Sequence, residues 1–501
     1  MDELYAGAKR LLVRVGELKN SLQPVQQLPP DMIVEIATYL NPRVCHGDCQ
    51  PLMAMSQVCH YWREILISNP ESWCFVRSKY LDLVPLFLER SGSYPLEADL
   101  IDPWLSYAVR RISPHVNRLA ILRCHVEELD TVSLRTLSPL RHSPNLHTLI
   151  VSTGALTDEL APELIEMPFV SGNMPNLRTL RLISFPVTPQ FVQFNHLIDL
   201  RLEDISSSLT AVLDLLAANP SLEKVRLTGN FENTEDSRTA ESIVLGCLQF
   251  LSVEQCVPRE FLEKVTFPPK ARIYIRYNIA SRFIPSAFDL PQSVEEYPNL
   301  QELSSLHILM EFKSDTYIDA TGPNGSVAMR FTELNDPFPV CNAIVSLPTT
   351  GITRLVCELH PALTMIPRDK VIRIMKVLPN LEEIKLVHFC EENMQDFLSA
   401  LGNTNEWTKL TRLKFVHCRQ ITDWIVDLIH AVRGRKREGL TLDAVTVVYR
   451  KGERLPELLE RLERAVGTLG LVEEEAGEVV RSGLVWDDGS CTARVTTVLV
   501  G

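Results

Sequence analysis

The chain has 501 residues, of which 45% are hydrophobic and 23% are charged, values close to the globular average. Its 50 Lys and Arg residues are outnumbered by 63 Asp and Glu residues, so the formal net charge is −13. These figures exclude a wholly disordered chain. They also argue against general nucleic-acid binding, because neutralising phosphates requires a cationic surface.

Targeting signals are missing from the sequence as given. The first 22 residues are charged throughout and lack the apolar core of a signal peptide. No run of about 18 apolar residues occurs, so no membrane span and no membrane partner are expected. The 12 cysteines are dilute and include no Cys-x-x-Cys pair. We therefore expect reduced thiols and a cytoplasmic or nuclear location, or both.

Residues 1–27 are predicted to contain an amphipathic helix. Apolar residues recur at helical spacing, at Leu4, Ala8, Leu11, Leu12, Val15, Leu18 and Leu22. Two interpretations stay open. The stripe packs against the next module or another helix, or the helix is a solvated leader.

Residues 28–75 are predicted to form a compact module of short helices. Pro29, Pro30 and Asp31 are typical of a helix start, and Asn41-Pro42 ends that helix. A second helical run follows from residue 52 to 66, and Asn69-Pro70 ends it before Trp73. Fewer than about 50 residues cannot bury these apolar faces well, so the module is expected to complete its core against a partner or neighbouring domain.

The module resembles an F-box. The resemblance rests on a Leu-Pro start, an acidic residue, Ile and Leu at helical spacing, the sequence Val-Cys-x-x-Trp-Arg at 58–63, and a terminal Trp73. It implies apolar binding to a Skp-type adaptor, and through it to a cullin. The residues to which this role is assigned are Leu28, Pro29, Pro30, Met32, Ile33, Ile36, Leu40, Leu52, Val58, Cys59, Trp62 and Ile65.

Three features depart from the F-box pattern. Ala37 stands where a large aromatic residue is common, Ser72 stands where Leu usually precedes the Trp, and the loop at 43–51 is longer than usual. That region also holds Cys45, His46, Cys49, Cys59 and His60, which are possible zinc ligands. The Cys-x₃-Cys spacing does not match a paired zinc motif, so neither a metal nor a cofactor is predicted.

Residues 76–109 are predicted to be connecting helices, and residues 110–450 an irregular leucine-rich repeat. The motif L-x-x-L-x-L recurs every 20 to 31 residues in the clear stretches, and two wider gaps, 248–300 and 300–352, each predict one degenerate copy. Clear copies are Leu146/Leu149/Val151, Leu177/Leu180/Leu182, Leu197/Leu200/Leu202, Leu222/Val225/Leu227, Leu248/Leu251/Val253, Leu381/Ile384/Leu386 and Leu410/Leu413/Phe415.

The repeat predicts an α/β solenoid in which short parallel strands alternate with helices. Eight residues after the first anchor, several copies carry a residue that resembles the inward Asn/Cys position of leucine-rich repeats. These residues are Cys124, Asn230, Cys256 and Cys418, and the cysteines are predicted to be buried structural thiols. Residues 440–449 are predicted as the last strand, and 451–501 as a C-terminal helix followed by a cap or tail.

One basic run, at Arg433, Arg435, Lys436 and Arg437, is predicted to be a solvated helix end. A nuclear-import signal and a patch for an acidic partner remain alternatives.

No catalytic role is predicted. The phosphate-binding GxxxxGK[ST], the dinucleotide-binding GxGxxG, GxSxG and HExxH are all absent. The combined resemblance, an F-box followed by a leucine-rich repeat, implies a substrate receptor of a Skp–cullin–F-box ubiquitin ligase, with an unknown protein as substrate. The alternatives are a leucine-rich-repeat scaffold that does not engage a ligase, and an enzyme in the irregular region 257–345, which no motif supports.

Overall fold

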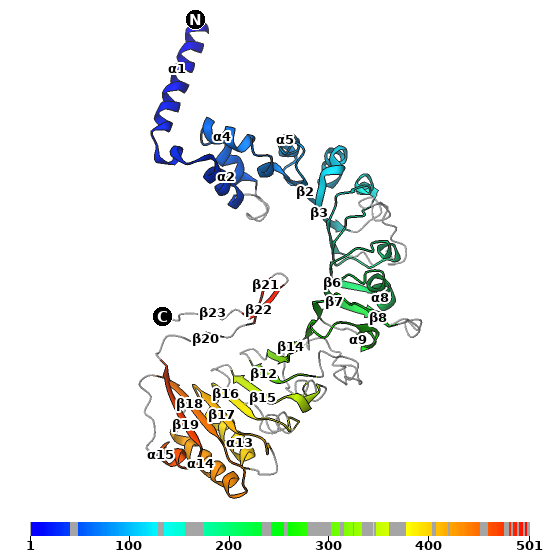
Figure 1. The fold of residues 1–501 in the computed structure, drawn as a ribbon. Helices are drawn as coiled ribbons and strands as arrows, with labels where there is room; N and C mark the ends of the chain where they lie inside the picture. The colour runs from blue at the N-terminus through cyan, green and yellow to red at the C-terminus, as the bar shows by residue number, and fades with distance from the viewer. Residues whose placement is uncertain are drawn as a thin grey trace. The chain divides into compact units, whose positions relative to one another are not determined.

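A computed structural model describes most of the chain, which divides into two compact units, residues 1–248 and residues 249–501 (Figure 1). Each unit is treated separately below. The described residues are 2–40, 49–128, 135–155, 174–232, 242–254, 259–278, 302–310, 315–323, 325–332, 344, 347–359, 377–402, 407–418, 421–450, 459–474, 480–481, 484–487, 490–493 and 496–497.

The first unit begins with helices. Pro at the start of α2, α3 and η2 fits a first helical turn, where no backbone N–H is needed. Cys59 caps α4, because its Sγ accepts the backbone N–H of Trp62 at 3.4 Å. The elements are α1 (Asp2–Ser21), η1 (Pro24–Gln27), α2 (Pro30–Tyr39), α3 (Gln50–Ser56), α4 (His60–Ile67) and η2 (Pro70–Trp73).

A parallel sheet follows in the first unit, and each strand pairs with the next in chain order. The array starts earlier than predicted, because residues 76–109 contain strands as well as helices. The strands are β1 (Phe75–Arg77), β2 (Leu96–Ile101), β3 (Leu119–Glu128), β4 (Thr148–Ala155), β5 (Thr179–Ile183), β6 (Asp199–Ser208) and β7 (Lys224–Glu232). Between them lie η3 (Leu81–Leu83), α5 (Val84–Arg90), α6 (Leu105–Ile112), η4 (Ser113–Arg118), η5 (Ser138–Leu140), η7 (Pro189–Gln193) and α8 (Leu209–Ala217), and β8 (Ile243–Val244) ends the unit.

The leucine motif sets the strand register. Leu149, Leu180, Leu200 and Val225 are Cα partners across β4 to β7, and all four are fully buried. The next buried row is formed by Val151, Leu182, Leu202 and Leu227. Burying one such side chain contributes about 1.5–3 kcal/mol, so stacked repeats build a core that a single copy cannot.

Several repeats carry a residue with left-handed backbone, at the end of the strand or, in β6, within it. Ser184, Asp204, His388 and His417 have φ values of 51°, 51°, 61° and 50°, and each lies four residues after the second anchor of its repeat. Gly229 occupies the same repeat position with φ of 137°, where a Cβ atom would collide with the backbone of Ile205. Only glycine tolerates that geometry, so the irregular pairing within β7, where Gly229 lies opposite Ile205, depends on Gly229.

The second unit continues the same plan with one interruption. Its strand order is β9–β11–β14–β13–β12–β15–β16–β17–β18–β19. All neighbours are parallel except β13, which is antiparallel to both β12 and β14. The strands are β9 (Phe250–Glu254), β11 (Arg272–Asn278), β12 (Ser305–Met310), β13 (Thr316–Thr321), β14 (Ser326–Thr332), β15 (Arg354–Leu359), β16 (Glu383–Val387), β17 (Arg412–Val416), β18 (Ala444–Arg450) and β19 (Thr468–Glu474).

The two wide gaps in the leucine pattern do not hold just one degenerate repeat each. The strands β11, β12, β13 and β14 lie between β9 and β15. Position 300 lies outside the described residues, and the buried anchors of β12 are Leu303, Leu306 and Ile308. The array also continues past the predicted last strand, because β19 pairs in parallel with β18.

The remaining elements of this unit are its helices and five two- to four-residue strands. They are α9 (Arg259–Lys264), β10 (Val265–Thr266), η10 (Thr349–Gly351), α13 (Glu391–Leu401), α14 (Ile421–Arg437), α15 (Leu459–Glu463), β20 (Val480–Arg481), β21 (Leu484–Asp487), β22 (Ser490–Ala493) and β23 (Thr496–Thr497). β21 and β22 form an antiparallel hairpin, and β20 and β23 form a separate antiparallel pair. In the described parts of the chain, no helix combines the length and the apolar character needed to cross a membrane.

Candidate protein-binding surfaces

Trp73 fixes the helical module to the start of the sheet. The ring is fully buried, and its indole N–H donates to the Leu66 carbonyl at 2.7 Å. Phe87 of α5 meets the ring edge-on at 5.2 Å between centroids, and the Arg90 guanidinium lies 4.3 Å from the ring centroid. These contacts join α4 and α5, so the module and the first strands pack as neighbours.

The predicted adaptor-binding residues divide by exposure. Ile33, Leu52 and Trp62 are buried, so they build the module's own core and are not available to a partner. The half-buried members are Leu28, Ile36, Leu40, Cys59 and Ile65, and the exposed members are Pro29, Pro30, Met32 and Val58.

An exposed apolar surface remains on the module. Met32 is 50% exposed and Val58 is 51% exposed. Tyr61, which the sequence did not single out, is also exposed, and its hydroxyl donates to the Leu28 carbonyl at 3.2 Å, next to Pro29. Pro29, Met32, Val58 and Tyr61 are called the module patch below. The sequence could have indicated that Tyr61 is exposed, because it directly precedes the core residue Trp62 in α4 and therefore lies on a different side of the helix.

Two departures from the F-box pattern lie inside the module. Ala37 is 1% exposed, and Ser72 is buried with its hydroxyl 3.0 Å from the Asn69 side-chain amide that donates to it. They therefore alter interior packing and leave the module patch unchanged. Most of the long loop, with Cys45 and His46, lies outside the described residues, among which no cluster of three metal-binding side chains occurs.

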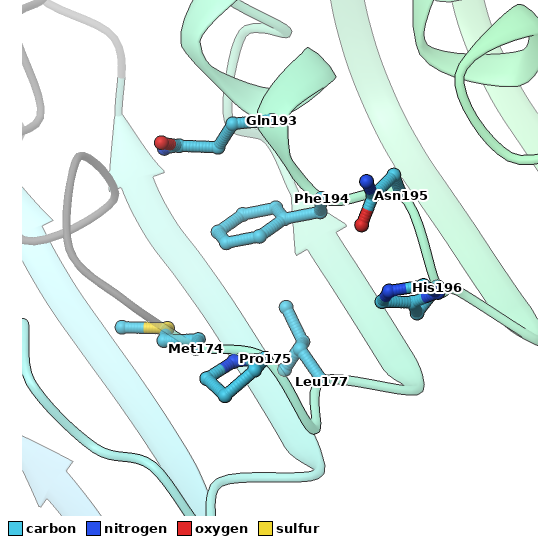
Figure 2. A pocket seen from close by; sticks show the side chains of 7 residues that line it. All are labelled: Met174, Pro175, Leu177, Gln193, Phe194, Asn195 and His196. Carbon is cyan, nitrogen blue, oxygen red and sulfur yellow. The ribbon is translucent and has the colours of Figure 1, made fainter.

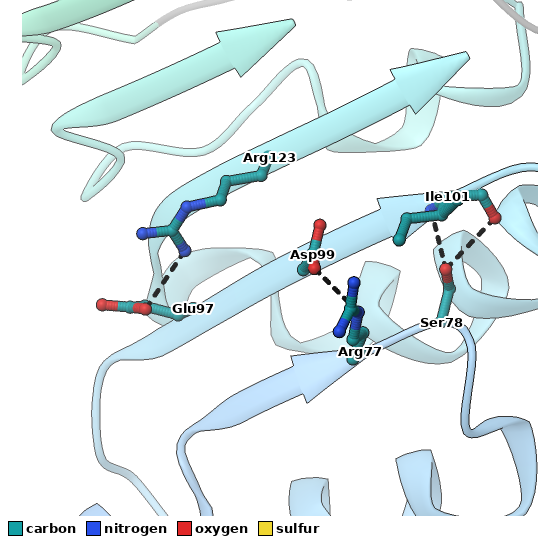
Figure 3. Close-up of polar contacts among 6 residues, drawn as sticks. All are labelled: Arg77, Ser78, Glu97, Asp99, Ile101 and Arg123. Atoms are coloured by element: carbon teal, nitrogen blue, oxygen red, sulfur yellow. Dashed lines mark hydrogen bonds and ion pairs between the residues drawn. The ribbon is translucent and has the colours of Figure 1, made fainter. Parts of the chain in front are cut away.

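Ion pairs cover the polar face of the first strands (Figure 3). Arg77 pairs with Asp99 at 3.0 Å, and Arg123 pairs with Glu97 at 3.2 Å. Burial raises the pKa of Asp99, although Arg77, Arg123 and His125 oppose the shift. Ser78 ties the strand ends together, since its Oγ accepts the Ile101 N–H at 2.7 Å.

A small cavity of about 230 Å³ lies beside the segments that precede β5 and β6 (Figure 2). It is below the 300–1,000 Å³ typical of ligand sites, so it fits a single side chain better than a cofactor. Its lining residues are Met174, Pro175, Leu177, Gln193, Phe194, Asn195 and His196.

The cysteines at the predicted Asn/Cys position differ in the part of the repeat in which they lie. Cys418 is buried, with Sγ 3.7 Å from the carbonyls of Leu386 and Val416, as predicted. Cys124 is buried too, but it pairs in register with Val151 and so belongs to the strand core, not to the loop position. Cys256 and the side chain of Asn230 lie outside the described residues.

The basic run of α14 is not uniformly solvated. Arg433, Lys436 and Arg437 are exposed, but Arg435 is fully buried and donates to the Trp407 carbonyl at 2.7 Å. Burial lowers the pKa of the Arg435 guanidinium. A receptor or acidic partner can therefore reach only the other three.

Comparison with known proteins gives little. No family model matches the chain, and no curated protein matches it. One similar solved structure is an internalin from Listeria monocytogenes, which is 13% identical, with 64% of this chain and 87% of that chain covered and a TM-score of 0.26. The strand register and the buried leucine rows are what show a mixed α/β chain with a leucine-rich-repeat-like solenoid.

Proposed function

We propose that this chain is the substrate-recognition subunit of a Skp–cullin–F-box ubiquitin ligase. The module would bind a Skp-type adaptor, and through it a cullin, while the solenoid holds a protein substrate. The chain itself would perform no chemistry. Its contribution is proximity, because it brings a substrate within reach of the ligase's catalytic partners in the cytoplasm or nucleus.

The module patch is the observation that carries this proposal. Its exposed members Pro29, Met32 and Val58 belong to the set for which the F-box resemblance implied adaptor contact. Exposed apolar side chains on a small module favour a protein partner, because burying them removes apolar area from water. The Trp73 contacts support the second half of the proposal, since they hold the module beside the first strands of the repeat array.

Co-expression with a Skp-type adaptor, followed by size-exclusion chromatography, tests the proposal. The unmodified chain should co-elute with the adaptor as a 1:1 complex. Met32→Asp with Val58→Asp should abolish co-elution, because two carboxylates would be buried in an apolar interface. Val244→Asp is the matched control, since Val244 is 61% exposed and lies far along the chain from the module.

The double variant Met32→Asp with Val58→Asp should fold normally, because both side chains are at the surface of the module. Substituting Trp62 would empty part of the module core, whereas Met32 and Val58 are half exposed and tolerate a charge. Undiminished co-elution of the folded double variant would reject the module patch. Failure of the unmodified chain to bind would leave the second candidate, a leucine-rich-repeat scaffold outside any ligase, which the solenoid alone supports.

A further inference from the structure

Three arginines stand in one row across the sheet of the first unit. Arg181, Arg201 and Arg226 are Cα partners on β5, β6 and β7. They alternate with the buried Leu180, Leu200 and Val225, so they lie on the face of the sheet opposite the leucine core. We call them the arginine row.

Neighbouring strands are about 4.8 Å apart, and like charges placed directly opposite each other destabilise a sheet. Two carboxylates offset part of this repulsion. Arg181 pairs with Glu203 at 2.7 Å, and Arg201 contacts both oxygens of Asp199 at 3.2 and 3.1 Å. These bonds hold the first two guanidinium groups in place across the face.

The third arginine has no such compensation. Arg226, and Lys224 on the same face of β7, form no ion pair with any residue that the structure describes. Four cations thus face two carboxylates, in a chain whose formal net charge is −13. Side chains of Arg181 and Arg201 are 35% and 19% exposed, and Arg226 is half-buried, so solvent reaches the row.

We propose that the arginine row and Lys224 receive an acidic segment of a protein partner, a short run of Asp and Glu residues. Three strands span about 10 Å, which equals about three residues of extended chain at roughly 3.3 Å each. A guanidinium binds a carboxylate through two parallel hydrogen bonds, so the carboxylates of such a run that face the sheet can pair with members of the arginine row. This inference rests on the proposed function, because it specifies the chemistry of the substrate that the solenoid holds.

Fluorescence anisotropy with the full chain tests the inference. The probe is a fluorescein-labelled peptide with four consecutive glutamates between Gly-Ser flanks, and the comparison peptide has glutamines in their place. We expect the glutamate peptide to bind at least tenfold more tightly, with affinity falling as salt rises. No binding of the glutamate peptide, or equal binding of both peptides, would overturn the inference.

Matched variants locate the binding. Lys224→Ser with Arg226→Ser should weaken binding of the glutamate peptide at least tenfold. Arg110→Ser with Arg111→Ser removes the same charge from two exposed positions of α6 and should leave binding unchanged. Equal losses in both double variants would show a non-specific charge effect and reject the site. Arg226→Lys, which keeps the charge, should retain most of the binding and guards against a folding defect.

Two further measurements separate the possible failures. A peptide with phosphoserines in place of the glutamates distinguishes sources of negative charge, and binding by that peptide alone would overturn the assignment to Asp and Glu. Co-elution with the Skp-type adaptor should be intact in the Lys224/Arg226 double variant. Loss of peptide binding with intact co-elution supports the inference, whereas loss of both would reject a separate surface for the substrate.

Discussion

Cys124 and Cys357 occupy the same repeat position, where the neighbouring strands carry Val151 and Leu386. Both thiols are enclosed by apolar side chains. Burial raises the pKa of Cys124 and brings the pKa of Cys357 to about 12, because an apolar environment disfavours the thiolate. Here cysteine acts as a small apolar side chain.

This setting predicts selective thiol labelling. At pH 8 the pKa of Cys357 leaves almost no thiolate, so Cys124 and Cys357 should resist iodoacetamide while the exposed Cys247 reacts. Raising the pH toward 12 would increase reactivity only as thiolate forms or the chain unfolds. Peptide mass spectrometry of the labelled chain checks this, and labelling of Cys357 at the rate of Cys247 would contradict its burial.

Arg435 shows that a basic sequence run can hide a structural residue. Removing its side chain in Arg435→Ala takes a donor from the Trp407 carbonyl and leaves a cavity in the α14 packing. The expected cost is about 3 kcal/mol of unfolding free energy. Arg437→Ala, at an exposed position two residues later, should change it by less than about 0.5 kcal/mol. Urea unfolding compares the two variants, and equal midpoints would contradict the burial of Arg435.

At the scale of elements, α1 is the helix whose sequence pattern and packing disagree. The stripe exists, but Leu4 is 78% exposed and Leu18 is 67% exposed, so it does not pack on the helical module. Of the two interpretations of residues 1–27, the structure favours the solvated helix. A 20-residue helix whose apolar side chains are exposed is marginally stable in water.

Deleting residues 2–21 should therefore leave the melting temperature of the chain unchanged, because α1 buries little apolar surface. Far-ultraviolet circular dichroism should show at most a small loss of helical signal. A lowered melting temperature would mean that α1 packs against the rest of the chain.

The elements also show what the sequence can and cannot predict. Strands with the L-x-x-L-x-L motif were predictable, because each anchor is buried and the strands share one register. β1 and β2 lack the full motif, and the reversal at β13 depends on pairing with β12 and β14. The sequence Gly-Pro-Asn-Gly at 322–325 is typical of a turn, but a turn sequence does not say which strands pair. The module illustrates the same limit, since Ile33 faces the core and its neighbour Met32 faces solvent. The apolar spacing assigns both residues to the helix face that binds a partner or the core, and it cannot tell which of the two is buried.

At the scale of the whole molecule, two surfaces of the first unit have different proposed roles. The module patch is apolar and is proposed to bind the Skp-type adaptor. The arginine row is charged and is proposed to bind an acidic segment of the substrate. Strand register brings together Arg181, Arg201 and Arg226, which are separated by about 20 to 25 residues in the sequence.

The most direct test is hydrogen–deuterium exchange of the full chain, measured with and without a Skp-type adaptor. If the chain is a ligase receptor, the adaptor should slow amide exchange only in residues 28–67, around the module patch. Exchange in β3 to β7 should be unchanged. Protection in the strands but not in the module, or no protection at all with a folded chain and excess adaptor, would contradict the account.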